Sequence, residues 1–126
     1  MRLSLLLAIG IGGFIGAILR FTISTWIQKL FSPLLPVGTL AVNVIGSFTI
    51  GFMILYFENV ISPNQKALII TGMLGALTTF STFSLETVIM LQEGLWSRAF
   101  ANITLNTFLS IFATIIGMVL FKRIYG

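Results

Sequence analysis

Hydrophobic residues along this 126-residue chain form four long segments that are separated by short, more polar connections. The segments cover residues 3–27, 37–57, 66–91 and 98–121. Each is long enough to cross a bilayer as a helix, which takes about 20 apolar residues. The connections contain all three prolines of the chain, and proline is typical of helix boundaries. The pattern predicts an all-α membrane protein with four transmembrane helices in one domain, residues 1–126.

Composition supports the membrane class. Hydrophobic residues make up 57% of the chain and charged residues only 8%, too few to cover a soluble domain of this length. The net charge of +4 comes mostly from single, scattered Lys and Arg residues, so we expect no nucleic-acid partner. The absence of Cys and His excludes disulfides, thiol chemistry and the usual zinc sites. No nucleophile, base and orienting group occur at a usable spacing, so we expect no enzyme.

The first hydrophobic segment resembles a signal peptide because it follows Arg2 closely. It runs to about Leu19, which is long for the apolar region of a signal peptide, and no small-residue cleavage site precedes a polar mature domain. We therefore expect it to be a retained first span.

Lys and Arg are divided almost evenly between the two sides of the membrane that four spans define. The side with both termini carries Arg2, Lys66, Lys122 and Arg123. The other side carries Lys29, Arg98 and, near a helix end, Arg20. Because a bias in Lys and Arg sets the orientation of a membrane protein, this balance leaves two alternatives open. The chain either has one fixed orientation or inserts in both orientations and pairs as an antiparallel dimer.

Polar residues inside the hydrophobic segments need partners, because each unsatisfied polar group in hydrocarbon costs several kcal/mol. Asn43 and Ser47 share one face of the second segment, either as contacts between helices or as part of a functional site. The fourth segment carries a polar stripe at four-residue spacing: Asn102, Asn106, Ser110 and Thr114. This spacing keeps the stripe on one face of a helix and favours a functional polar track.

The third segment contains a run rich in Gly, Ser and Thr. Five of the ten residues from Gly75 to Ser84 are Ser or Thr, which are poor helix formers and suit a short break at mid-membrane depth. A break frees backbone carbonyl groups, which must be buried in protein or line a cavity and could coordinate sodium or potassium. Glu86 follows the run and is either a functional group or a protonated structural acid.

The donors inside the spans are amides and hydroxyls, which suit a small desolvated anion. An anion can also rest against the positive edge of a phenyl ring. Phe80 and Phe83 are three residues apart, so they point in neighbouring directions on a helix, and slight unwinding would align them. The alternative is that both rings face lipid or the protein core.

The run Gly75-x-x-Thr78-Thr79-Phe80-Ser81-Thr82-Phe83-Ser84 resembles the signature of the bacterial Fluc (CrcB) fluoride channels. Two further matches are Gly12-Gly13, Gly16 and Leu19-Arg20 in the first segment and Pro36-x-Gly38-Thr39-Leu40-x-Val42-Asn43 at the second. The resemblance covers the whole chain. It implies a fluoride-selective channel for passive fluoride export in the bacterial inner membrane. It also implies an antiparallel, dual-topology homodimer with a broken third helix and two pores along the subunit interface.

The resemblance further implies a structural, non-transported sodium ion held by the backbone carbonyl groups of Gly75 and Thr78 from both subunits. It implies that the fluoride pore is lined by Asn43, Phe80, Phe83, Asn106, Ser110 and Thr114. It implies pore support or vestibule roles for Arg20, Thr79, Ser81, Thr82 and Glu86.

Two other functions remain open from the residues. A proton-coupled transporter of the small multidrug type is also a four-span, dual-topology dimer and needs a membrane carboxylate, for which Glu86 is the candidate. A non-transporting membrane subunit would not need the polar stripe of the fourth segment.

Overall fold

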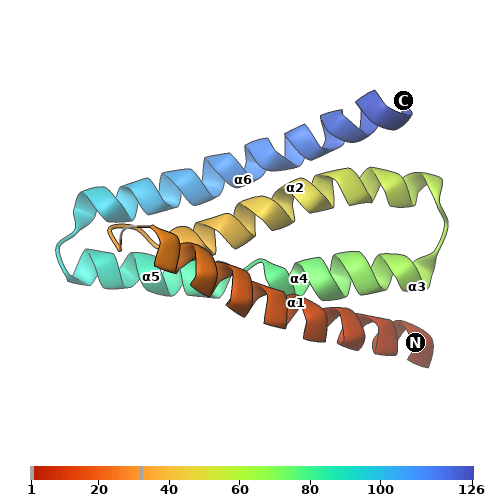
Figure 1. Ribbon diagram of the computed structural model, residues 1–126, viewed down its shortest axis with the longest axis horizontal. Helices are drawn as coiled ribbons and strands as arrows, with labels where there is room; N and C mark the ends of the chain where they lie inside the picture. The colour runs from red at the N-terminus through yellow and green to blue at the C-terminus, as the bar shows by residue number, and fades with distance from the viewer. Residues whose placement is uncertain (1, 32) are drawn as a thin grey trace.

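The computed structural model describes residues 2–31 and 33–126, and helices are the only regular secondary structure in those residues. Four helical segments are long and apolar enough to cross a membrane: α1 (Leu3–Leu30), α2 (Val37–Asn59), Pro63–Gln92 and α6 (Trp96–Tyr125). The prediction of an all-α protein with four transmembrane helices is confirmed. Both termini lie at the same end of the molecule as the connection between α2 and α3 (Figure 1), as an even number of spans requires.

The third membrane segment consists of four consecutive pieces: α3 (Pro63–Lys66), η1 (Ala67–Leu74), α4 (Gly75–Leu77) and α5 (Phe80–Gln92). η1 is a π-helix, a form that is rare and frequently found at functional sites. Between α4 and α5 the backbone is extended, with φ −83° and ψ 156° at Thr78 and φ −149° and ψ 122° at Thr79. The chain thus leaves the helical conformation for two residues near the middle of this segment (Figure 1).

α1 and η1 approach each other closely at glycine positions. A Cβ atom at Gly12 would overlap the backbone of Leu68, and one at Gly16 would overlap the backbone of Met73. Small residues four apart allow this backbone-to-backbone contact, which dispersion forces stabilise in the absence of a hydrophobic drive between helices in lipid.

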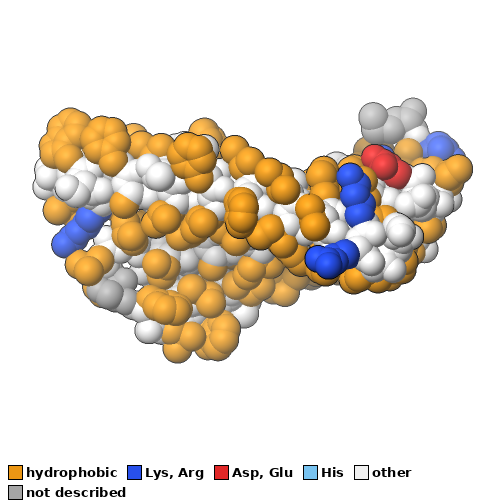
Figure 2. All heavy atoms as spheres, turned by 90° about the horizontal axis from the view of Figure 1, so that it is seen from above, with side chains coloured by type: hydrophobic (Ala, Val, Ile, Leu, Met, Phe, Trp, Pro, Cys, Tyr) orange, Lys and Arg blue, Asp and Glu red, His pale blue; other side chains and the backbone are white. Residues whose placement is uncertain are grey.

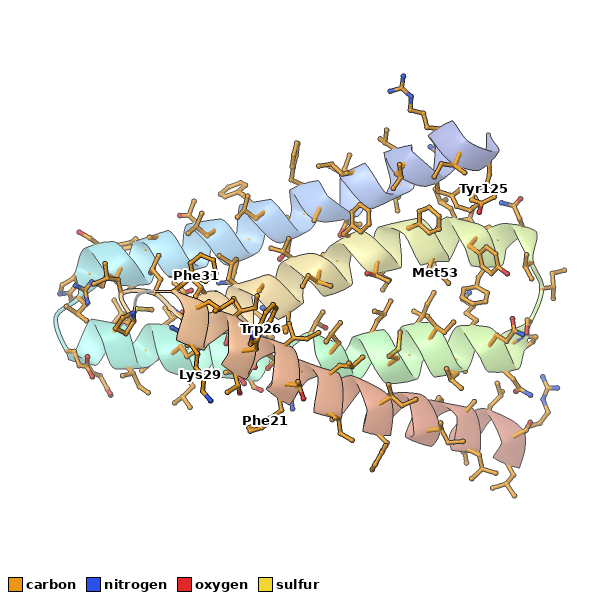
Figure 3. All side chains as sticks on the ribbon, viewed as in Figure 1. Phe21, Trp26, Lys29, Phe31, Met53 and Tyr125 are labelled. Carbon is orange, nitrogen blue, oxygen red and sulfur yellow. The ribbon has the colours of Figure 1, made fainter. Side chains whose placement is uncertain are left out.

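α2 and α6 use the same device. A Cβ atom at Gly51 would overlap the backbone of Thr114, and one at Gly117 would overlap the backbone of Phe48. Tyr125 lies at one end of this pair (Figure 3). Its ring centroid is 6.3 Å from that of Phe52. The glycine contacts therefore set the separation of α1 from η1 and of α2 from α6.

The outer surface is largely apolar. Apolar side chains cover most of the face seen in Figure 2, while Lys and Arg side chains lie toward the two ends of the molecule. Phe21 is 72% exposed and points away from the other helices (Figure 3). Such a surface is stable in lipid and not in water. The chain is a multi-pass membrane protein.

Candidate functional site

A groove of about 410 Å³ lies beside the extended residues between α4 and α5. It brings together these residues of the predicted site: Asn43, Gly75, Thr78, Thr79, Phe80, Phe83, Asn106 and Ser110. Ser47, which the sequence leaves open as a helix contact or a site residue, also lines the groove, and five further lining residues are not predicted: Gly46, Ile50, Ile70, Leu74 and Thr107. Residues far apart in the chain thus line one groove.

Three predicted residues lie on other cavities. Arg20 and Thr82 line a cavity of about 220 Å³ that Thr79 also borders. Thr82 and Glu86 line a neighbouring cavity of about 440 Å³ together with Lys29. The Oε1 atom of Glu86 is buried and has no hydrogen-bond partner among the described residues. Thr79 borders both the groove and the cavity that Arg20 lines.

Two more predicted residues, Thr114 and Ser81, also lie outside the groove. Thr114 donates its hydroxyl to the carbonyl of Ser110 at 3.1 Å, and its backbone packs against Gly51. The Oγ atom of Ser81 lies 3.5 Å from Oγ1 of Thr79. In this conformation, the side chain of Thr114 bonds its own helix, and the side chain of Ser81 lies beside Thr79, the residue before α5.

Asn43 pairs with the extended backbone at Thr79. The N–H of Thr79 donates to Oδ1 of Asn43 at 2.8 Å, and Nδ2 of Asn43 donates to the carbonyl of Thr79 at 3.1 Å. Nδ2 also donates to Oδ1 of Asn106 at 3.0 Å. An Asn side chain has two amide hydrogens, so both are occupied. The side chain acts as the hydrogen-bonding partner that the helix no longer supplies to Thr79.

Two carbonyl groups near the break lose their usual helical donors. In an α-helix the N–H of Thr79 would donate to the carbonyl of Gly75, and that of Thr82 to the carbonyl of Thr78. Instead the N–H of Thr79 bonds Asn43, and the N–H of Thr82 bonds Oγ1 of Thr79 at 3.2 Å. The carbonyl groups of Gly75 and Thr78 therefore lack their helical donors, and both residues line the groove.

Thr79 is the N-cap of α5. Its Oγ1 accepts a hydrogen bond from the N–H of Thr82 and donates one to Oγ1 of Thr82 at 3.1 Å. A threonine with extended backbone and this bond is a favourable helix start, which explains why the helix resumes at Phe80.

Three buried side chains continue the contact from Asn43. Nδ2 of Asn106 donates to the carbonyl of Asn102 at 2.9 Å and to its Oδ1 at 3.0 Å. Nδ2 of Asn102 donates to Oγ1 of Thr87 at 3.0 Å, and Thr87 donates to the carbonyl of Phe83 at 2.8 Å. Hydrogen bonds therefore connect α2, α6 and α5 and return to the helix that carries Phe83.

The groove contains two aromatic rings and an unpaired hydroxyl. The rings of Phe80 and Phe83 have centroids 5.4 Å apart and an interplanar angle of 59°. Phe80 is 77% exposed in the single chain. The Oγ atom of Ser110 is buried and has no hydrogen-bond partner among the described residues. Ring edges and a free hydroxyl both attract an anion.

Sequence comparison identifies known relatives of this chain. A family model described as "CrcB-like protein, Camphor Resistance (CrcB)" matches residues 7–118. The chain is 70% identical, over the whole length of both proteins, to a protein from a Sulfurovum species named fluoride-specific ion channel FluC. The chain belongs to the CrcB family.

Other CrcB relatives carry the same name. A relative from a Nitratiruptor species is 61% identical over 100% of this chain and 98% of its own. One from Campylobacter jejuni is 48% identical over 95% of this chain and 99% of its own. Each is named fluoride-specific ion channel FluC.

In this CrcB chain, sequence reasoning missed Thr87 and Thr107. A lone threonine in a membrane helix usually bonds its own helix, so neither residue stands out. Thr87 does make that bond, but it also accepts the bond from Asn102. Only the packing of α5 against α6 reveals the second contact.

Proposed function

We propose that this CrcB-family chain is a fluoride-selective ion channel, which lets fluoride leave a bacterial cell passively through the inner membrane. The observation that carries the proposal is the groove in which the free hydroxyl of Ser110 lies with the rings of Phe80 and Phe83. The full-length identity of 70% to a protein named as a fluoride-specific channel supports fluoride as the ion.

Fluoride is small and holds its hydration shell tightly, so a pathway must replace water with donors that are already in position. Ser110 offers such a donor, and the ring edges of Phe80 and Phe83 offer weaker positive surfaces. Both amide hydrogens of Asn43 are engaged, so Asn43 donates to fluoride only by exchanging one bond, such as that to Asn106. A narrow path of this kind favours fluoride over the larger chloride.

The channel is proposed to be an antiparallel homodimer with both orientations in the membrane. Phe80 lines the groove and is 77% exposed in one chain, so a second copy would cover it. The near balance of Lys and Arg on the two sides supports insertion in both orientations. Native mass spectrometry of the purified protein is expected to give a dimer. A monomer alone, in a preparation that conducts, would contradict this part of the proposal.

We further propose that the carbonyl groups of Gly75 and Thr78 hold a structural sodium ion between the two copies. Unwound backbone carbonyls are typical sodium ligands within membranes. These two carbonyls lose their helical donors, and both residues line the groove. Two carbonyls from each copy would make a site of four oxygen ligands. The bound ion would supply a positive charge that links the copies.

Fluoride efflux from liposomes tests the channel. Vesicles that contain the purified protein are loaded with fluoride, and release is followed with a fluoride electrode. Rapid fluoride release without matching chloride release is expected. No fluoride release, or chloride release at the same rate, would contradict the proposal.

Phenylalanine variants localise the pathway. Phe83→Ile and Phe80→Ile are expected to slow fluoride release because they remove the ring edges from the groove. Phe14→Ile is the matched control, since Phe14 is 69% exposed on α1 and is not among the groove residues. If all three variants release fluoride at the same rate, the rings of Phe80 and Phe83 are not part of the pathway.

Removal of sodium tests the proposed sodium site separately. Purification and reconstitution without sodium, with potassium in its place, are expected to reduce fluoride release strongly. Unchanged release without sodium would contradict the sodium site and leave the channel proposal intact.

A further inference from the structure

The hydrogen bonds from Thr79 to Phe83 form a circuit with a defined direction. They run from the N–H of Thr79 through the side chains of Asn43, Asn106, Asn102 and Thr87 to the carbonyl of Phe83. Each bond is between 2.8 and 3.0 Å long. Both ends of the circuit lie in the backbone around the start of α5, while the middle passes through α2 and α6.

The two ends fix the orientation of every side chain in between. A backbone N–H only donates, so the atom of Asn43 that faces Thr79 must be its oxygen. Nδ2 of Asn43 then faces Asn106, whose near atom must also be an oxygen. The same rule holds at Asn102 and makes its nitrogen face Thr87. From the other end, the carbonyl of Phe83 only accepts, so Thr87 must donate to it and accept from Asn102.

We propose that Asn102 and Thr87 are positioning residues, which hold the Asn43 amide in one orientation and thereby keep the start of α5 attached to α2. This inference rests on the proposed fluoride channel for its functional consequence. Phe80 and Phe83 lie on α5 between the two attachments, at Thr79 and at Thr87. Loss of either attachment leaves this part of the groove free to shift.

Asn102 and Thr87 act through other residues and not by lining the groove. Asn102 is 2% exposed and Thr87 is 7% exposed, and neither is among the groove residues. Asn106, which is 6% exposed, connects them to Asn43. In such a buried network each group depends on the orientation of the next, so removal of one member affects the far end.

Thr87→Val tests the inference, with Thr49→Val as its matched control. Thr49 donates to the carbonyl of Ile45 at 2.8 Å, the same bond within the helix that Thr87 makes at 2.8 Å to Phe83. Only Thr87 also accepts a bond from an asparagine. The difference between the two variants therefore isolates the circuit from the ordinary threonine bond. Thr87→Ser keeps the hydroxyl and is expected to behave as the wild type.

The primary measurement is hydrogen exchange of the Thr79 amide, followed by NMR in micelles of protein labelled with ¹⁵N-threonine. Thr87→Val is expected to speed this exchange by about five-fold or more, as loss of one buried hydrogen bond allows. Asn102→Leu is expected to do the same, and it keeps the Thr87 bond to Phe83 available. A merely local role for Thr87 would leave the amide of Thr79, eight residues earlier, unchanged.

Fluoride release from liposomes is measured on the same variants. Thr87→Val and Asn102→Leu are expected to release fluoride more slowly than Thr49→Val. Unchanged Thr79 exchange in both variants would overturn the inference, as would faster exchange with unchanged fluoride release. If Thr87→Val does not fold, Asn102→Leu decides alone. The exchange experiment needs no fluoride. Absence of fluoride release from the wild type would therefore contradict the proposed function, while the exchange rate of the Thr79 amide would still test the roles of Asn102 and Thr87.

Discussion

Replacing Asn43 with leucine removes the side chain that bonds the extended backbone between α4 and α5, while it keeps a similar volume. Three hydrogen bonds are lost, with lengths of 2.8, 3.1 and 3.0 Å. The N–H of Thr79 is then left without a partner in a residue that is 8% exposed. The carbonyl of Thr79 and Oδ1 of Asn106 each lose one donor.

The hydrogen bonds of Asn43 determine how much stability the substitution removes. An unsatisfied buried donor costs about 1–3 kcal/mol, and each ordinary bond contributes a net ~1 kcal/mol. The losses overlap because they share one side chain. We therefore expect Asn43→Leu to lower the free energy of unfolding by about 3 kcal/mol.

Asn59→Leu is the matched control on the same helix. The side chain of Asn59 donates to the carbonyl of Leu55 at 3.1 Å in an exposed position and makes no other side-chain hydrogen bond among the described residues. Its replacement is expected to change the free energy of unfolding by less than about 0.5 kcal/mol, as is usual for surface sites.

Titration of micelle-solubilised protein with SDS measures both variants, and the fluorescence of Trp26 and Trp96 reports unfolding. A large difference between Asn43→Leu and Asn59→Leu is expected. If the two variants unfold at the same SDS fraction, then Asn43 is not the residue that stabilises the break, and the assigned hydrogen bonds are wrong.

Three further outcomes are expected. Glu86→Gln should retain fluoride release from liposomes, because Glu86 lies with Lys29 in a cavity apart from the groove; loss of all release would contradict this separation, and drug resistance that depends on Glu86 would favour the multidrug transporter instead. Thr79→Ala should lower the free energy of unfolding in the SDS titration by about 1 kcal/mol through loss of the N-cap, whereas equal stability of Thr79→Ala and Thr79→Ser would argue against capping. Gly117→Val should disrupt the α2–α6 contact and yield aggregated protein in size-exclusion chromatography, while Gly10→Val should not, since a Cβ atom at Gly10 meets nothing within 4 Å; normal elution of both would contradict the close contact.

The four membrane helices follow from the sequence because a segment in lipid must satisfy its backbone within itself. Their ends are less visible in the hydrophobic pattern. α6 begins at Trp96 and ends at Tyr125, and its last turn contains Lys122 and Arg123. Aromatic and basic residues are common at the membrane interface, where they lower the hydropathy of a window without ending the helix.

The π-helix η1 has no signal in the sequence. Residues 67–74 read as an ordinary apolar helix, since composition does not distinguish a hydrogen bond to the fourth residue from one to the fifth. Gly12 and Gly72 bring the backbones of α1 and η1 into contact. A small residue can mark a close approach, but a local pattern does not identify the distant segment that it contacts.

The sequence indicates which residues gather at the candidate site better than it indicates the hydrogen bonds between them. Asn43 stands out as a polar residue in a hydrophobic segment, and the family resemblance implies that it lines the fluoride pore. The structure gives its hydrogen bonds to Thr79 and Asn106, which lie 36 and 63 residues further along the chain. Periodicity relates residues on one helix. It does not pair residues on different helices, so these bonds, and the contribution of Thr87, needed the structure.

Current through a planar bilayer tests the central claim most directly. The purified protein is placed between a fluoride solution and a chloride solution that share one cation, and the reversal potential is measured. Because the chloride side supplies no fluoride, a fluoride-selective channel predicts a large reversal potential, of the sign that opposes fluoride flow out of the fluoride side. A reversal potential near zero, or no current from protein that is folded and dimeric, would contradict fluoride selectivity through this groove.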